Sequence, residues 1–262
     1  MLLKRSFVPV VLGSLVCSLL IVGGAAQAAM ITVPGTSNPY LAGMPTATAA
    51  DITDLAPAQS PVLVGIGLPA GGWLEFNNAQ GLVANSPLLS GSSPYDWTAG
   101  PDGSLNYLPL HAIGAEYGKS NIMAPIDSLV GVFLDAQSGG SPAPSTLFFN
   151  TQVSRDYASL FPDLYQVFFI GDGLTSGLAQ QRVYVPSGAT RLYLGVMDGY
   201  NWNNNLGAFT VDVNAIPEPA TLGFLAAGGL VLLGRRRRRA DPRRHEAKRA
   251  PIASLNAGIQ TL

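Results

Sequence analysis

Short apolar runs, separated by glycine, proline, asparagine and aspartate, recur through the middle of the chain. They are rich in β-branched and aromatic residues, whereas long amphipathic helical stretches are scarce. Several short strands at such spacing are typical of an all-β sandwich, which we expect as one domain over residues 61–214. The expected strands lie within residues 62–67, 74–76, 128–134, 166–171, 181–185, 190–197 and 207–213.

The clearest alternation of apolar and polar residues comes in the last of these runs. Phe209, Val211 and Val213 alternate with Thr210 and Asp212. Because successive side chains of a strand point to opposite faces, the three apolar residues should share one buried face.

Two stretches lack this pattern. Residues 29–60 are rich in alanine, threonine, proline and serine, which predicts a flexible leader with at most one strand or short helix. Residues 136–165 contain paired glycines and three prolines and are expected to form an insertion loop. Within that loop, residues 154–160 could form one short helix.

The N-terminus has the three parts of a secretory signal peptide over residues 1–28. Lys4 and Arg5 precede an apolar stretch over 8–22, and Ala-Gln-Ala at 26–28 provides a small-residue cleavage site. The alternative is a membrane anchor that is never cleaved. The segment predicts export of the chain.

The C-terminus carries a second apolar segment. Residues 220–234 form a 15-residue apolar run that is followed at once by five arginines. The run is short for a transmembrane helix, which needs about 20 residues, and the arginines favour the cytoplasmic side. Pro217 and Pro219 cannot lie inside a helix, so the chain before the run should be extended and open to an enzyme.

This arrangement resembles the PEP-CTERM sorting signal of Gram-negative bacteria, over about residues 215–239. The resemblance implies processing by an exosortase in a host that makes extracellular polysaccharide. It implies export across the inner membrane, transient anchoring by the C-terminal helix, and release to the cell surface or extracellular matrix. Residues 240–262 depart from the family, whose chains usually stop soon after the arginines, and they are expected to form a disordered basic tail. The resemblance is carried by Pro217, Glu218, Pro219, Arg235, Arg236 and Arg237.

Charge is distributed unevenly along the chain. Residues 29–215 contain thirteen acidic residues and only four basic ones. Such an acidic body repels phosphate backbones, so we expect no binding to nucleic acid. It is compatible with binding a divalent cation. The four basic residues are Lys119, Arg155, Arg182 and Arg191.

Candidate chemistry is concentrated in the loop between the last two expected strands. Asp198 ends one strand, and a polar loop with Asn204 and Asn205 follows before Gly207. Carboxylate and amide oxygens in one loop suit Ca²⁺, which takes about six to eight oxygen ligands at about 2.3–2.6 Å. The alternative is a tight hairpin loop in which asparagine and glycine accept left-handed backbone geometry.

The order of motifs from Val183 to Asn214 is similar to the PA-IL type of calcium-dependent galactose-binding lectin: Val-Tyr-Val-Pro-Ser-Gly-Ala, a strand, Asp, Asn-Asn-Leu-Gly and an alternating strand. The resemblance implies a jelly-roll-like β-sandwich. It implies that Asp198, Asn204 and Asn205 bind Ca²⁺ through their side chains and that sugar hydroxyls bind the metal directly. A backbone-carbonyl ligand would fall near Asn201 or Trp202.

A further carbonyl ligand that the resemblance implies has no clear match, and residues 93–102 are its expected source. The aromatic residues Trp202, Tyr200 and Trp97 are candidates for stacking on a sugar ring. The alternative for each is packing in the core or anchoring of a loop.

Signals of catalysis are weak. The sequence has no Gly-x-Ser-x-Gly motif, and its only histidines are His111 and His245, so a histidine-based triad or zinc site is hard to build. We expect a non-enzymatic cell-surface or matrix protein associated with exopolysaccharide, with Ca²⁺ and a galactose-like glycan as its ligands. The alternatives are a purely structural matrix protein and a polysaccharide hydrolase.

Overall fold

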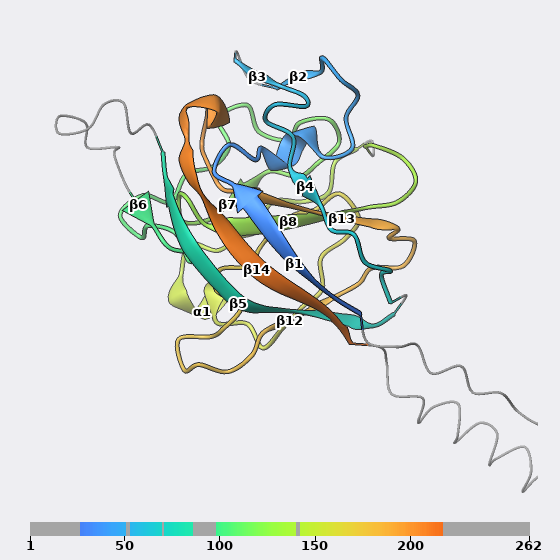
Figure 1. The fold of residues 1–262 in the computed structure, drawn as a ribbon, viewed down its shortest axis with the longest axis vertical. Helices are drawn as coiled ribbons and strands as arrows, with labels where there is room; N and C mark the ends of the chain where they lie inside the picture. Colours follow the sequence, from blue (N-terminus) through green and yellow to red (C-terminus); the bar gives the residue numbers. More distant parts are fainter. Residues whose placement is uncertain (1–26, 51–52, 70, 86–97, 140–141, 217–262) are drawn as a thin grey trace, which may run out of the picture. The chain divides into compact units, whose positions relative to one another are not determined.

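The computed structural model describes residues 27–50, 53–69, 71–85, 98–139 and 142–216, which form an all-β fold with two main sheets (Figure 1). The first sheet has six strands in the order β1 (Gln27–Pro34), β14 (Leu206–Ile216), β5 (Trp73–Ala84), β12 (Arg182–Tyr184) and β10 (Ser159–Leu160), with β6 (Thr98–Ala99) paired to β5. The second sheet has the order β11 (Val167–Phe169), β8 (Leu129–Leu134), β13 (Arg191–Val196) and β4 (Val62–Leu63).

Four short strands form two small separate sheets, β2 (Ala49–Ala50) with β3 (Asp54–Leu55) and β7 (Ile122–Met123) with β9 (Leu147–Phe148). Helical structure in the described residues is limited to α1 (Gln152–Arg155) and the 3₁₀ turns η1 (Pro39–Leu41) and η3 (Trp202–Asn204).

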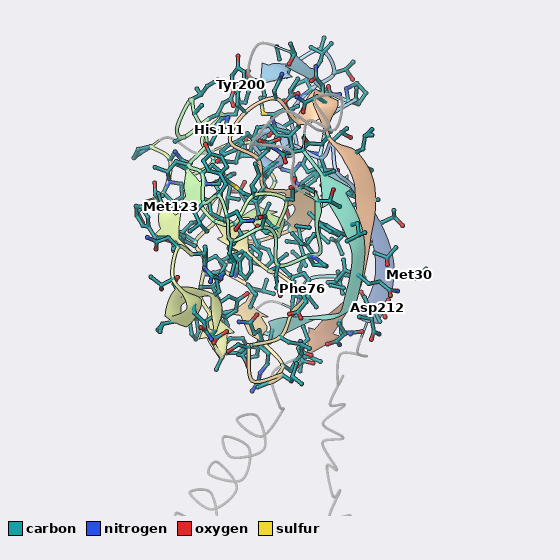
Figure 2. The ribbon with its side chains drawn as sticks, turned by 90° about the vertical axis from the view of Figure 1, so that its left-hand side faces the viewer. Met30, Phe76, His111, Met123, Tyr200 and Asp212 are labelled. Atoms are coloured by element: carbon teal, nitrogen blue, oxygen red, sulfur yellow. The ribbon has the colours of Figure 1, made fainter. Side chains whose placement is uncertain are left out.

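The main core lies between the two large sheets. Phe209, Val211 and Val213 of β14 are buried in it, as their alternation predicts. Figure 2 shows Phe76 between the sheets, whereas Met30 and Asp212 lie on the outer face of the six-stranded sheet. Burial of apolar side chains from both sheets is the dominant favourable term in such a fold.

The four-stranded sheet is buried on both faces. All six residues of β8 are buried, because its outward side chains pack in a second cluster with Tyr40, Phe149 and Trp202. This second cluster is covered by the loops that carry the candidate site.

The prediction of a flexible leader over residues 29–60 is wrong for much of that stretch. Strand β1 pairs with β14 along its whole length, from Gln27 opposite Ala215 to Pro34 opposite Ala208. Tyr40 is fully buried. The amino-acid composition of residues 29–60 does not reveal this strand, because the strand is held by hydrogen bonds to a partner far away in sequence.

The other expected strands occur where the apolar runs predict them, although most are shorter than the runs. Helix α1 begins earlier than the expected range 154–160, because Thr151 and Ser154 form a reciprocal capping box.

No helix among the described residues is long and apolar enough to span a membrane. The predicted helix over 220–234, the sorting residues from Pro217 to Arg237 and the tail over 240–262 lie outside the described residues, as does the signal peptide up to residue 26.

Candidate cation site in the loop after β13

The loop between β13 and β14 places the predicted ligands at one end of the sandwich. Asp198 is 5% exposed, and its Oδ1 accepts a hydrogen bond of 3.2 Å from the Tyr200 amide. Asn205 is 1% exposed, and its side-chain amide donates to the Gly35 carbonyl at 3.1 Å. Asp198 and Asn205 are therefore buried, although Tyr200 and Asn203 of the same loop are exposed.

The amide oxygens of the asparagine pair have no hydrogen-bond partner. The Oδ1 atoms of Asn204 and Asn205 are both buried, and neither accepts a hydrogen bond from a described residue. A buried acceptor without a donor costs about 1–3 kcal/mol. Each oxygen is therefore an acceptor that a cation or a water molecule could satisfy.

Sequence reasoning missed Asp127, which is completely buried beside this loop. Its backbone amide donates to the Met197 carbonyl at 2.8 Å, which brings Asp127 next to Asp198. Its backbone is left-handed, with φ of 63°. Neither of its carboxylate oxygens accepts a hydrogen bond of normal geometry from a described residue.

The pKa values of Asp127 and Asp198 are both raised. Burial therefore opposes the ionised form of each carboxylate more than the surrounding hydrogen bonds favour it. Burial, and then the charge of Asp198, raises the pKa of Asp127 to about 8, while the Asn85 backbone lowers it slightly. Burial also raises the pKa of Asp198 to about 6, against the opposing effects of the Tyr200 amide and the Asn205 side chain. The charge of Asp198 thus opposes ionisation of Asp127, and the charge of Asp54 opposes ionisation of Asp198.

A third acid, Asp54, holds the loop in place through hydrogen bonds. Its carboxylate accepts hydrogen bonds from the amides of Trp202 (3.0 Å) and Asn203 (2.8 Å), at the start of η3, and from the Asn38 side chain (3.1 Å). An acid at the start of a turn of helix satisfies amides that the turn itself leaves free. Asp54 was also missed, because it lies in the stretch predicted to be a flexible leader.

The structure corrects the sugar-stacking role suggested for Trp202. Its side chain is fully buried. The Tyr40 and His111 rings pack against it at centroid distances of 6.0 and 5.5 Å, and its Nε1 donates to the Val196 carbonyl at 2.7 Å. Trp202 anchors the loop instead. Tyr200 is 37% exposed and lies at the same end as His111 (Figure 2).

Both suggested carbonyl ligands already accept a hydrogen bond within η3. The Asn201 carbonyl accepts from the Asn204 amide at 3.5 Å, and the Trp202 carbonyl accepts from the Asn205 amide at 3.1 Å. Of the stretch 93–102, residues 93–97 lie outside the described residues. Trp97, the third candidate for sugar stacking, is among them.

A second acidic region lies around a pocket of about 390 Å³, lined by Asp102, Asp156 and Asp172 together with Arg155. Here the carboxylates of Asp102 and Asp172 accept hydrogen bonds from backbone amides of the same region. Asp102 Oδ1 accepts from the Asp172 amide at 2.9 Å, and Asp172 Oδ1 accepts from the Leu174 amide at 2.8 Å. These acids shape turns.

The donor set at the first region suits a hard cation. In the described part of the chain, no three histidine, cysteine, aspartate or glutamate side chains converge as a metal site. A cation held by Asp127 and Asp198 would therefore need further oxygens, and the asparagine pair is the nearest source in the sequence of the loop. Carboxylate and amide oxygens together are the ligands that Ca²⁺ prefers.

The fold places the chain among all-β proteins with two packed sheets. Comparison with known proteins adds no narrower assignment, since no protein-family model, curated protein or solved structure matches the chain.

Proposed function

We propose that this protein is an exported, non-catalytic surface or matrix protein that binds Ca²⁺ through Asp127, Asp198, Asn204 and Asn205. The observation that carries the proposal is the burial of two carboxylates and two amide oxygens with no donor to satisfy most of them. The ion would supply the positive charge that these oxygens lack. In this role the acids hold a structural ion and take no part in a reaction.

The proposed ligand of the bound ion is a polysaccharide of the host's extracellular matrix. The similarity of residues 183–214 to the PA-IL-type lectins supports this assignment, as does the predicted jelly-roll-like sandwich. Tyr200 is the exposed aromatic residue of the loop that could contact a sugar. The sorting signal from Pro217 to Arg237 would deliver the protein to that matrix through an exosortase.

Calorimetric titration of the purified protein with CaCl₂, at neutral pH after treatment with a chelator, tests the metal. We expect one site per chain, and at least tenfold weaker binding by Asp198→Asn. Asp212→Asn is the matched control, because Asp212 lies on the outer face of β14 and contacts Asn78 instead. Absence of calcium binding by the unaltered protein would leave the purely structural matrix protein as the better account.

The sorting route has its own test. In the native host, the combined variant Pro217→Ala and Glu218→Ala should retain its C-terminal segment, whereas the unaltered chain should lose it. Intact mass of the recovered proteins measures this. Identical mature masses would contradict processing at this motif.

A further inference from the structure

Three aromatic side chains gather on the outer face of the six-stranded sheet, at the end of β14 that lies away from the Asp198 loop. We call Trp73, Phe161 and Tyr184 the aromatic cluster. The Trp73 ring lies 5.1 Å from that of Phe161 and 5.2 Å from that of Tyr184, between centroids. Arg182 lies 5.9 Å from the Trp73 ring centroid.

The cluster is a surface feature and not part of the core. Phe161 is 63% exposed, while Trp73 and Tyr184 are half-buried. Their strand neighbours Leu74 and Val183 are buried between the sheets, so Trp73 and Tyr184 must point outward. Contiguous exposed apolar groups of this kind commonly mark an interaction site.

The cluster lies where both ends of the described chain meet. Trp73 pairs with Ile216, the last residue of β14, and Gln27 at the start of β1 pairs with the neighbouring Ala215. Figure 1 shows the start of β1 beside the end of β14. Along the sequence, only residues 217–219 separate Ile216 from the apolar run at 220–234. That separation spans at most about 14 Å of extended chain.

We propose that the aromatic cluster is a membrane-contact surface, which lies in the lipid headgroup region while the C-terminal apolar run is inserted. The proposal rests on the membrane-anchored stage of the proposed sorting route. Tryptophan and tyrosine prefer the membrane–water interface, and Arg182 can reach lipid phosphate through its long side chain.

The ring geometry favours lipid over a sugar chain. Trp73 meets Phe161 at an interplanar angle of 74° and Tyr184 at 71°. Trp73 therefore packs edge to face against both other rings, whereas Phe161 and Tyr184 are tilted at 37° to one another. The three rings together offer no common flat face on which several sugar rings could stack. Such a compact apolar group with one cation suits the disordered boundary between headgroups and acyl chains.

The test uses the chain over residues 29–262, without the predicted signal peptide, in vesicles of phosphatidylethanolamine and phosphatidylglycerol. This chain contains no cysteine, because Cys17 is the only one in the sequence. Single cysteines at Phe161→Cys and Leu82→Cys carry an environment-sensitive fluorophore. The sites are matched, because Leu82 is 61% exposed and faces outward on β5. It lies nine residues from Trp73, or about 30 Å.

We expect headgroup spin-labelled lipid to quench the probe at 161 at least threefold more than the probe at 82. Adding Trp73→Ser and Tyr184→Ser should remove that difference while the chain still floats with the vesicles. Equal quenching at both sites in floating protein would overturn the membrane contact and leave the sorting route intact. Failure to float would overturn both. A change at 161 caused by soluble polysaccharide without vesicles would instead assign the cluster to glycan.

Discussion

The two acidic regions of this protein both contain aspartates, but the burial and hydrogen bonding of these aspartates differ. Around the 390 Å³ pocket, Asp156 accepts hydrogen bonds from the Ser176 amide and hydroxyl at 2.9 and 2.5 Å, and these bonds lower its pKa. In the loop after β13, burial raises the pKa of Asp127 to about 8, and the opposing interaction with the Asn85 backbone is too weak to compensate for that burial. The difference teaches that unsatisfied burial, rather than local acidity, identifies a candidate cation site.

The largest expected loss from a substitution comes from removing Asp54, which holds the loop in place. Asp54→Ala should lower the free energy of unfolding by about 3 kcal/mol, because it leaves the buried Trp202 amide, the part-buried Asn203 amide and the Asn38 side chain without their acceptor. Calcium affinity should fall with it. Asp156→Ala is the matched substitution in the other region, and it should change stability little. Chemical denaturation measures both, and equal losses would contradict the distinction between the regions.

The second prediction concerns the pH dependence of the calcium-free protein. Because the folded-state pKa values of Asp127 and Asp198 are raised to about 8 and about 6, their protonated forms favour the fold. Their stabilising effect is complete below the unfolded value of about 3.9 and is lost as pH rises to about 8. The two pKa values together lie about six units above their unfolded values. At about 1.4 kcal/mol per unit, we expect a loss on the order of 8 kcal/mol across that range.

The variant Asp127→Asn tests which of the two carboxylates causes this loss of stability. It removes the higher of the two titrations, so stability without calcium should become nearly constant above about pH 6 and should exceed that of the unaltered protein at pH 8. Denaturant titrations at a series of pH values provide the measurement. A flat profile for the unaltered chain between pH 5 and 8 would show that Asp127 is compensated in solution.

The smallest expected effect lies in the second region. Asp172→Ala removes the acceptor of the Leu174 amide in a part-buried turn, which should cost about 0.5–1.5 kcal/mol. Calcium affinity, measured by calorimetry on the same sample, should not change. A drop in affinity would mean that the pocket lined by Asp102 and Asp172 holds the ion instead.

The sequence reveals the parts of the fold that depend on local pattern. Alternation over β14 predicts correctly that Phe209 and Val213 are buried, because the period of a strand is visible within a few residues. Strand β1 shows no such signal. Its position depends on pairing with β14 almost two hundred residues away, which one sequence cannot display.

The residues of the candidate site also differ in whether the sequence alone reveals them. Asp198, Asn204 and Asn205 can be found from the sequence because they are neighbours in one loop. Asp127 cannot, since it follows a proline-containing turn and reaches the loop only through its backbone bond to Met197. Trp202 is misjudged for a related reason, because its burial comes from Tyr40 and other distant residues.

The central claim is that the oxygens of Asp127, Asp198, Asn204 and Asn205 share one cation. A crystal structure of the protein grown with CaCl₂, with anomalous data collected at long wavelength, tests it most directly. We predict a single calcium peak at about 2.3–2.6 Å from oxygens of both carboxylates and of the asparagine pair. A water molecule or a protein donor at that position, with no anomalous peak, would contradict the account.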